Sequence, residues 1–141
     1  MIAVDTSAIL AIALDEPEAE TFKAALRRDG VLIGWPTLFE TRIVLAAKGF
    51  PNAAEIVARL AAAPNVTTVP FDAKHYAAAE VAYERFGKGR HPAALNMGDC
   101  FAYAVAAVAA VAGCPLLFKG ADFPETDVVR HPDAAVLGGR R

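Results

Sequence analysis

Residues 95–123 read LNMGDCFAYAVAAVAAVAGCPLLFKGADF and decide the fold. The alanine-rich part predicts a buried helix over 98–112, and the short apolar part after it predicts a buried strand over 116–118. Asp99 is the only charged side chain within that helix and strand, and Asp122 follows the strand. A carboxylate in apolar surroundings is costly unless it is paired, hydrogen-bonded or bound to a metal ion. These acids are therefore candidates for a functional site.

Two other segments carry a lone acid in the same way. Asp5 is the only charged residue among residues 1–14, where it follows a short apolar run. Glu40 is the only charged residue from 30 to 41. The candidate site residues are therefore four acids from four distant segments: Asp5, Glu40, Asp99 and Asp122.

The whole chain alternates between short apolar runs and helical patterns. We predict strands at 1–4, 31–34, 66–69, 116–118 and 127–130, and helices at 6–14, 15–28, 36–47, 52–63, 72–86 and 98–112. Such alternation is typical of an α/β fold, a three-layer α/β/α sandwich with a central, mostly parallel sheet. We expect one domain over residues 1–133 and a flexible tail over 134–141.

Topology brings the four acids together. Asp5 and Asp122 follow predicted strands, whereas Glu40 and Asp99 lie in the first turns of predicted helices. In open parallel sheets, ligands bind beyond the carboxyl ends of the strands, and the helices of right-handed crossovers begin at that same edge. The sequence therefore predicts that all four carboxylates converge at one edge of the sheet.

Composition limits the classes of function. The chain has 141 residues, 55% of them hydrophobic, with a net charge of -2 and a pI near 5.9. That is enough apolar material for one core, and it provides no general attraction for nucleic acid. Nucleic-acid binding must therefore use a local basic patch, and the densest one is the loop 85–92. Lys88 and Arg90 of this loop, and Lys119 beside the predicted site, are the candidate RNA-binding residues.

Three features of the sequence bear on the cellular location of the protein. Cys100 and Cys114 lie in apolar segments without a CxxC spacing, which indicates buried thiols in a reducing compartment, and the cytoplasm fits best. The uncharged run 101–118 is interrupted by glycine and proline, so we expect no membrane span. The amino-terminal apolar stretch lacks a basic region and contains Asp5, so we expect no signal peptide.

Clustered carboxylates repel one another, and a divalent cation relieves that repulsion. An all-oxygen site without a His or Cys cluster favours Mg²⁺, with Mn²⁺ able to substitute, and Mg²⁺ often also takes phosphate oxygens of a substrate. A metal ion of this kind lowers the pKa of a water and so supports hydrolysis of a phosphodiester without a protein nucleophile. The sequence has no GxSxG motif and no Walker A loop, which agrees with this chemistry.

The same residues resemble a known family. The segments VDTS at 4–7, LNMGDC at 95–100 and LLFKGADF at 116–123, with Glu40 between them, resemble the PIN-domain ribonucleases and specifically the VapC-type toxins of toxin–antitoxin pairs. The resemblance covers nearly the whole chain in the right order. It implies a Mg²⁺-dependent endoribonuclease that acts on RNA, is a homodimer, and is inhibited by a VapB-like antitoxin.

The resemblance also implies roles for individual residues. The acidic quartet of the family matches Asp5, Glu40, Asp99 and Asp122. Thr126 and Asp127 match a frequent ending of the family, which gives Asp127 a supporting role around the metal ligands. Beside the resemblance, the residues themselves allow a hydroxyl of Thr6 or Ser7 to orient Asp5 or a metal-bound water, and Asn96 to orient Asp99.

Structural roles compete with these assignments. Thr37 and Glu40 have the spacing of a capping box for the helix that begins near Pro36. Asp99 could simply complement a helix amino terminus, and Asp5 could cap the helix after it. Ser7 and Asn96 are also good helix caps.

Two other classes of function stay open on the sequence alone. One is another metal-dependent phosphoesterase or DNA nuclease, although a dehalogenase-type phosphatase needs an Asp-x-Asp motif and this chain has Ser7 at the second position. The other is a non-catalytic receiver-like signalling domain, in which Asp72 would be the only candidate phosphorylation site.

Overall fold

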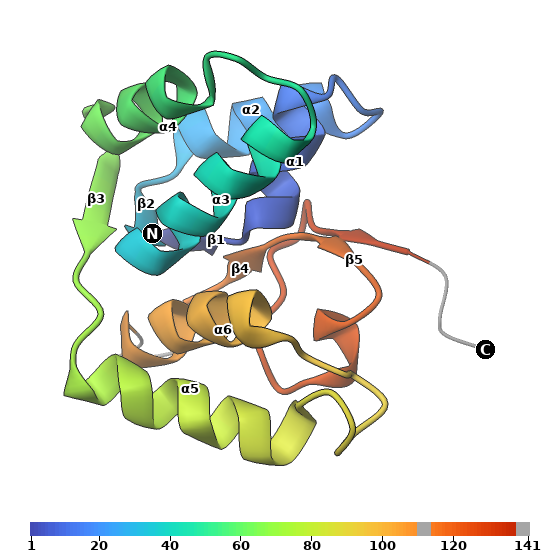
Figure 1. Cartoon of the computed structure of the whole chain (residues 1–141). Coiled ribbons are helices and arrows are strands. Elements are labelled where there is room, and N and C mark those ends of the chain that lie inside the picture. The colour runs from blue at the N-terminus through green and yellow to red at the C-terminus, as the bar shows by residue number, and fades with distance from the viewer. Residues whose placement is uncertain (110–113, 138–141) are drawn as a thin grey trace.

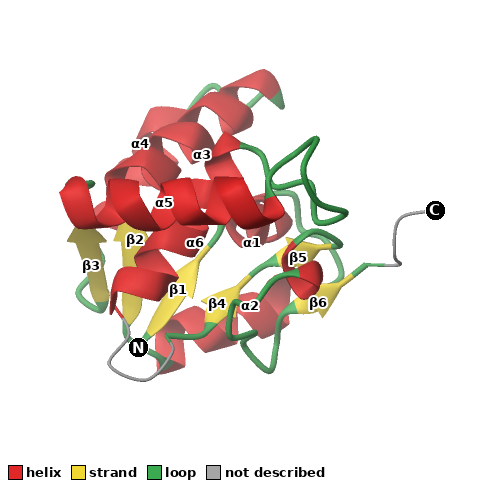
Figure 2. Ribbon diagram, turned by 90° about the horizontal axis from the view of Figure 1, so that it is seen from below, coloured by secondary structure: helices red, strands yellow, loops and turns green. Residues whose placement is uncertain are grey.

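The computed structural model describes residues 1–109 and 114–137. A central sheet of four parallel strands has the order β3-β2-β1-β4 (Figure 2). Its strands are β1 (Ile2–Val4), β2 (Val31–Gly34), β3 (Val66–Val69) and β4 (Leu116–Leu117). The predicted mostly parallel sheet is therefore confirmed, with β1 between β2 and β4.

Helices cover both faces of this sheet, which gives the predicted three layers (Figure 1). One face carries α1 (Thr6–Ala13), α2 (Ala19–Arg28), α3 (Trp35–Ala47) and α4 (Ala53–Ala62). The other face carries α5 (Ala73–Phe86) and α6 (Met97–Ala109). The predicted end of the last helix, at 112, lies outside the described residues.

Strand β1 shows how a short apolar run builds two cores. Successive side chains of a strand point to opposite faces. Ala3 therefore packs in the core beneath α5 and α6, whereas Ile2 and Val4 pack in the core beneath α1, α2 and α4. Because both faces of β1 are buried, the run has no polar residue until Asp5, at the carboxyl end of the strand.

Two helix starts follow from local signals and one departs from the prediction. Asp72 caps α5, and Pro36 occupies the first turn of α3. The helix predicted from residue 15 begins only at Ala19. Asp15 has a φ of +53°, which is incompatible with a helical residue and turns the chain between α1 and α2.

The carboxyl-terminal segment differs from the prediction in two ways. The strand expected at 127–130 is wrong, because only Arg130 pairs with β4, as an isolated bridge to Leu116. The tail expected from residue 134 is also wrong in part, because β6 (Ala135–Val136) pairs in parallel with β5 (Lys119–Gly120). Residues 138–141 lie outside the described residues.

Among the described residues, each helix is too short or too polar to cross a membrane.

Candidate active site

The carboxyl ends of the central strands carry the predicted acids. Asp5 follows β1 directly and is buried, with 5% of its surface exposed. Its carboxylate caps α1 by accepting a 3.0 Å hydrogen bond from the backbone N–H of Ser7. The capping role considered for Asp5 is therefore confirmed, and it fixes this carboxylate at the carboxyl edge of the sheet.

Burial raises the pKa of Asp5 from its ordinary value of 3.8 to about 6. The negative charge of Glu40 raises this pKa further, whereas hydrogen bonds from Ser7 and Thr6 lower it. A buried carboxylate with an acidic neighbour prefers to be neutral unless a cation compensates its charge. The site therefore disfavours a second negative charge in the absence of a cation.

Asp99 lies in the first turn of α6 and is half-buried. Its Oδ2 accepts a 3.0 Å hydrogen bond from the backbone N–H of Asn96, and Asn96 Oδ1 accepts a 2.8 Å hydrogen bond from the backbone N–H of Asp99. This reciprocal pair is a capping box and orients Asp99 at the start of the helix. The capping role expected for Asn96 is thus confirmed.

The pKa of Asp99 is raised from 3.8 to about 7, first by burial and then by the charge of Asp5. The charges of Asp122 and Glu40 raise it as well, while the hydrogen bond from Asn96 lowers it. Each of the other three predicted acids therefore acts electrostatically on Asp99. Four segments far apart in sequence converge at one edge, as the sequence predicted.

Glu40 is positioned by two contacts that the sequence did not reveal. Its Oε1 accepts a 2.6 Å hydrogen bond from the Thr6 hydroxyl on α1. Its carboxylate also lies against Gly98 of α6, where an added Cβ atom would come within 1.8 Å of Glu40 Oε2. Glycine at this position therefore lets α6 approach the acid on α3.

The capping box considered for Thr37 and Glu40 is wrong. Helix α3 begins at Trp35 with Gly34 as its N-cap, and no side-chain hydrogen bond caps it. Thr37 therefore lies inside the first turn, and its buried hydroxyl has no hydrogen-bond partner among the described residues. Glu40 belongs to the acidic edge rather than to a helix cap.

Asp122 completes the acidic edge from the loop after β5. It is half-buried and precedes the short 3₁₀ helix η1 (Phe123–Glu125). Its charge contributes to the raised pKa of Asp99, which places the two acids within electrostatic reach.

The side chains at the acidic edge offer the kind of ligand atom that a hard divalent cation prefers. This donor set consists of carboxylate oxygens only, and two of its members, Asp5 and Asp99, have raised pKa values because they are buried among other negative charges. In the described part of the chain, no three His, Cys, Asp or Glu side chains are close enough together to enclose a metal ion as placed.

The predicted supporting residues divide into two groups. Ser7 Oγ accepts a 3.0 Å hydrogen bond from the backbone N–H of Lys119, and Asn96 is bonded to Asp99, so both touch the acidic edge. Thr126 instead closes its own loop through a 2.7 Å hydrogen bond to the Phe123 carbonyl.

Asp127 is placed apart from the acids. Its carboxylate pairs with Arg85 at 3.0 Å and accepts a 2.7 Å hydrogen bond from the Tyr103 hydroxyl. Tyr103 lies one helical turn after Asp99 on α6, so Asp127 supports that helix rather than contacting the acidic edge.

The predicted RNA-binding cations have different environments. The Lys119 ammonium is bound by Glu18 at 2.8 Å and Glu16 at 3.2 Å. The Arg90 guanidinium stacks on Tyr83 at 4.8 Å and pairs with Glu84 at 3.4 Å.

Lys88 is exposed in the loop between α5 and α6, and no carboxylate among the described residues pairs with it. This ammonium is therefore available to a polyanion, in contrast to that of Lys119.

The remaining reactive side chains have structural roles. Cys100 and Cys114 are buried free thiols, as predicted, and burial raises the pKa of Cys100 to about 11. Asp72, the candidate phosphorylation site of the receiver-like alternative, caps α5 and lies 2.7 Å from His75 Nδ1. The structure therefore gives no support to a receiver site at Asp72.

Sequence reasoning missed the hydrogen bond from Thr6 to Glu40, the close approach of Gly98 to Glu40 and the glutamates that bind Lys119. A buried threonine next to Asp5 and a glycine next to Asp99 were visible signals, but their partners lie on other elements. Only the packing of α1, α3 and α6 at one edge reveals these contacts.

Comparisons with known proteins agree with this geometry. The PIN domain family matches residues 2–129. Ribonuclease VapC30 of Mycobacterium tuberculosis is 44% identical over 127 residues, covering 89% of this chain and 94% of the relative. Ribonuclease VapC of Mycolicibacterium smegmatis is 46% identical over 127 residues, covering 89% of this chain and 95% of the relative.

A solved structure shows the same fold. The crystal structure of Mycobacterium tuberculosis VapC20, described as a Sarcin-Ricin loop cleaving toxin, aligns with a TM-score of 0.63 and 21% sequence identity. The alignment covers 77% of this chain and 83% of that chain. The chain therefore belongs to the PIN-domain family and, within it, to the VapC ribonucleases.

Proposed function

We propose that this protein is a Mg²⁺-dependent endoribonuclease that hydrolyses RNA phosphodiester bonds at the edge formed by Asp5, Glu40, Asp99 and Asp122. The observation that carries the proposal is the placement of four acids from distant segments at one edge of the sheet, where Asp5 and Asp99 are fixed by backbone N–H groups and Glu40 by Thr6. The raised pKa of Asp99, which arises from burial and from the charges of the other three acids, agrees with this placement. A site that concentrates negative charge in this way is suited to a cation and, through it, to a phosphate group.

Each acid has a defined role in this proposal. Asp5 and Asp99 are held by hydrogen bonds to backbone N–H groups, which keep their carboxylates at the edge of the sheet. Glu40 is held by Thr6, and Asp122 approaches from the loop after β5. A bound Mg²⁺, for which Mn²⁺ can substitute, would supply charge compensation and Lewis acidity at the phosphodiester.

The remaining residues bind and orient the RNA. Among the three predicted RNA-binding cations, Lys88 is the one without a carboxylate partner in the described residues, whereas Lys119 is neutralised by two glutamates. Asn96 orients Asp99, and Ser7 joins α1 to β5 beside Asp5.

The protein partners follow from the family. We propose a VapB-like antitoxin that inhibits the enzyme and a homodimer as its own assembly, because the relatives are VapC ribonucleases. We also propose that it acts in the cytoplasm, in agreement with its proposed RNA substrate. Co-expression with the neighbouring reading frame, followed by size-exclusion chromatography with light scattering, tests both partners.

The experiment that tests the nuclease is a cleavage assay with total RNA in Mg²⁺ and in EDTA. Cleavage by the wild type should require Mg²⁺ or Mn²⁺, and Asp5→Asn and Asp99→Asn should abolish it while remaining folded by circular dichroism. Glu55→Gln, an exposed acid of α4, is the matched control and should cleave normally. Full activity of either Asn variant contradicts the proposal.

A further inference from the structure

A hydrogen bond joins the loop that carries Asp122 to the helix that carries Asp99. The Tyr103 hydroxyl of α6 donates this bond to Asp127 Oδ1 at 2.7 Å, and Arg85 of α5 pairs with Asp127 Oδ2 at 3.0 Å. The contact lies apart from the acidic edge, but it links two of the elements that form the edge.

The residues from Asp122 to Asp127 form one hydrogen-bonded unit, which we call the Asp122 turn. The N–H of Glu125 donates to the Asp122 carbonyl at 3.2 Å. The N–H and the hydroxyl of Thr126 both donate to the Phe123 carbonyl, at 2.9 Å and 2.7 Å. Because these bonds tie the two ends of the turn together, a displacement at Asp127 also displaces Asp122.

The Asp122 turn is attached to the rest of the protein in two different ways. Phe123 is buried, and its ring lies 5.3 Å from the ring of Phe118. Burial of an apolar ring is favourable but non-directional, so it does not fix the orientation of the turn. The hydrogen bond from Tyr103 to Asp127 is directional. It therefore determines how the turn lies against α6.

Tyr103 is itself held in a fixed position. Its side chain is buried, and its ring lies 6.2 Å from that of Phe86. Burial, followed by the hydrogen bond to Asp127, raises the pKa of its hydroxyl to about 12, so the hydroxyl stays protonated and can donate at neutral pH. A hollow of about 150 Å³ beside this contact is lined by Ala106 of α6 and by Val129 after the turn. The hydrogen bond, rather than close packing, therefore joins the turn to the helix at this point.

Helical geometry relates Tyr103 to Asp99. The two residues are four positions apart on α6, so they lie on the same face of the helix. Asp99 and Asp122 are within electrostatic reach of each other, because the charge of Asp122 contributes to the raised pKa of Asp99. One face of α6 thus carries Asp99 directly and holds Asp122 through Tyr103 and Asp127.

We propose that Tyr103 is a positioning residue of the nuclease, which acts through Asp127 to set the place of Asp122 relative to Asp99. The inference rests on the proposed function, in which both acids are metal ligands. Loss of a hydrogen bond that orients a metal ligand typically lowers metal affinity roughly 10- to 100-fold. Since Tyr103 acts through the turn, we expect an effect of about tenfold, at the lower end of that range.

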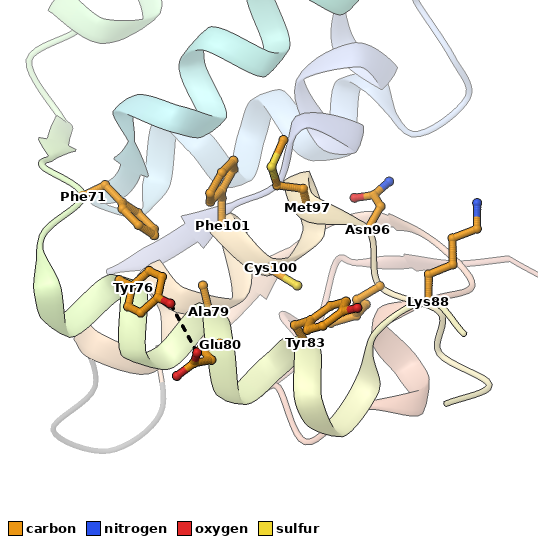
Figure 3. Close-up of a pocket in the computed structure, with 11 residues that line it drawn as sticks. Phe71, Tyr76, Ala79, Glu80, Tyr83, Lys88, Asn96, Met97, Cys100 and Phe101 are labelled. Carbon is orange, nitrogen blue, oxygen red and sulfur yellow. Dashed lines mark hydrogen bonds between the residues drawn. The ribbon is translucent and has the colours of Figure 1, made fainter. Parts of the chain in front are cut away.

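The test compares variants that lose one polar group each. Tyr103→Phe removes the hydroxyl and keeps the buried ring, and Asp127→Ala removes its acceptor. Tyr76→Phe is the matched control, because the Tyr76 hydroxyl also donates to a carboxylate, that of Glu80, at 3.2 Å. Figure 3 shows both side chains of this control pair beside a hollow of about 540 Å³ between α5 and α6.

Three measurements are made on each variant. Mn²⁺ affinity is measured by isothermal titration calorimetry without RNA, amide hydrogen exchange of the Asp122 turn is measured in EDTA, and stability is measured by urea unfolding. Tyr103→Phe should bind Mn²⁺ about tenfold more weakly than the wild type. The amides of Glu125 and Thr126 should exchange faster, whereas those in the middle of α6 should not. Tyr76→Phe should behave like the wild type in all three measurements.

A double variant tests whether Tyr103 acts through Asp127. Tyr103→Phe combined with Asp127→Ala should bind Mn²⁺ no more weakly than Asp127→Ala alone, because the acceptor is already absent. A further loss in the double variant would show that Tyr103 acts by another route, which overturns the inference.

The remaining outcomes separate a positioning role from a purely structural one. Wild-type Mn²⁺ affinity in Tyr103→Phe overturns the inference even if the urea midpoint falls, because the hydrogen bond then only stabilises the fold. Unchanged exchange of the turn overturns it as well. RNA cleavage in Mg²⁺ is measured independently. A wild type that cleaves RNA while Tyr103→Phe binds Mn²⁺ normally contradicts only the role of Tyr103, whereas weakened Mn²⁺ binding without any wild-type cleavage contradicts only the nuclease.

Discussion

The hydroxyl of Thr6 donates a 2.6 Å hydrogen bond to the carboxylate of Glu40, which joins α1 to α3 at the acidic edge. Thr6 Oγ1 also lies 3.1 Å from Thr41 Oγ1, which donates a 2.8 Å hydrogen bond to the Thr37 carbonyl. Glu40 is therefore held by a buried network and not by its own helix.

Thr6→Val should lower RNA cleavage roughly 10- to 100-fold, the usual effect of losing a residue that orients a metal ligand. Valine has the shape of threonine but cannot donate to Glu40. Thr6→Ser keeps the hydroxyl and should restore most of the activity. The measurements are cleavage rate and Mn²⁺ affinity, and a Val variant with wild-type Mn²⁺ affinity would show that Thr6 does not position the acid.

Gly98→Ala should reduce activity about tenfold or more while changing stability little. The new methyl group would displace the Glu40 carboxylate, which is the flexible end of a side chain, and alanine favours the helix by up to about 1 kcal/mol over glycine. Cleavage and urea unfolding measure the two effects.

The control for Gly98→Ala is the same substitution made in a Glu40→Ala protein. Without the carboxylate, Gly98→Ala has nothing to displace, so the double variant should be no less active than Glu40→Ala alone. A further loss in the double variant would mean that Gly98 acts on something other than Glu40.

Stability in EDTA should fall as the pH rises from about 5 to 8. The pKa values of Asp5 and Asp99 in the folded protein are about 6 and about 7, above the ordinary value of 3.8. The folded state therefore binds more protons than the unfolded state between pH 4 and 7. The resulting stabilisation is fully present below about pH 4 and is lost as the pH rises through the folded pKa values.

Asp5→Asn should flatten that dependence and stabilise the metal-free protein at pH 8 by on the order of 1–3 kcal/mol. The measurement is the urea midpoint at several pH values in EDTA. The wild type should regain stability at pH 8 when Mg²⁺ is added, and Asp5→Asn should regain less. A pH-independent wild-type midpoint between pH 5 and 8 would contradict the raised pKa values.

Lys88→Met should weaken RNA binding more than Lys119→Met does. Lys88 has no carboxylate partner among the described residues, whereas Lys119 is bound by Glu16 and Glu18. The slope of log affinity against log salt should decrease by about 1 for Lys88→Met, because one phosphate contact is lost. An equal effect of the two substitutions would mean that RNA displaces the glutamates from Lys119.

The sequence was sufficient to predict the layered α/β fold and the convergence of the acids. Strand and helix patterns are local, and the parallel topology places Asp5 and Asp99 at one edge by general rules of connection. The hydrogen-bond network that joins Thr6 to Glu40 could not be predicted from such local patterns. Thr6 and Glu40 are 34 residues apart, and nothing in the spacing of either residue indicates their contact.

The wrong predictions about helix starts and strands also have physical causes. Thr37 and Glu40 matched a capping box, but α3 begins two residues before Thr37, at Trp35, so the helix contains the whole motif. Residues 127–130 are apolar enough for a strand, yet the chain there meets β4 at Arg130 alone. The hollow of about 540 Å³ between α5 and α6 depends on how these two helices pack together, which no local sequence pattern encodes.

The middle position of β1 in the sheet determines when the acidic edge can be completed during synthesis. Strand β1 is synthesised long before its neighbour β4, which begins only at Leu116, and Asp122 comes later still. A nascent chain lacking those residues holds an unfinished sheet and three of the four acids. The complete set of four acids and the finished sheet are therefore present only after most of the chain has been synthesised.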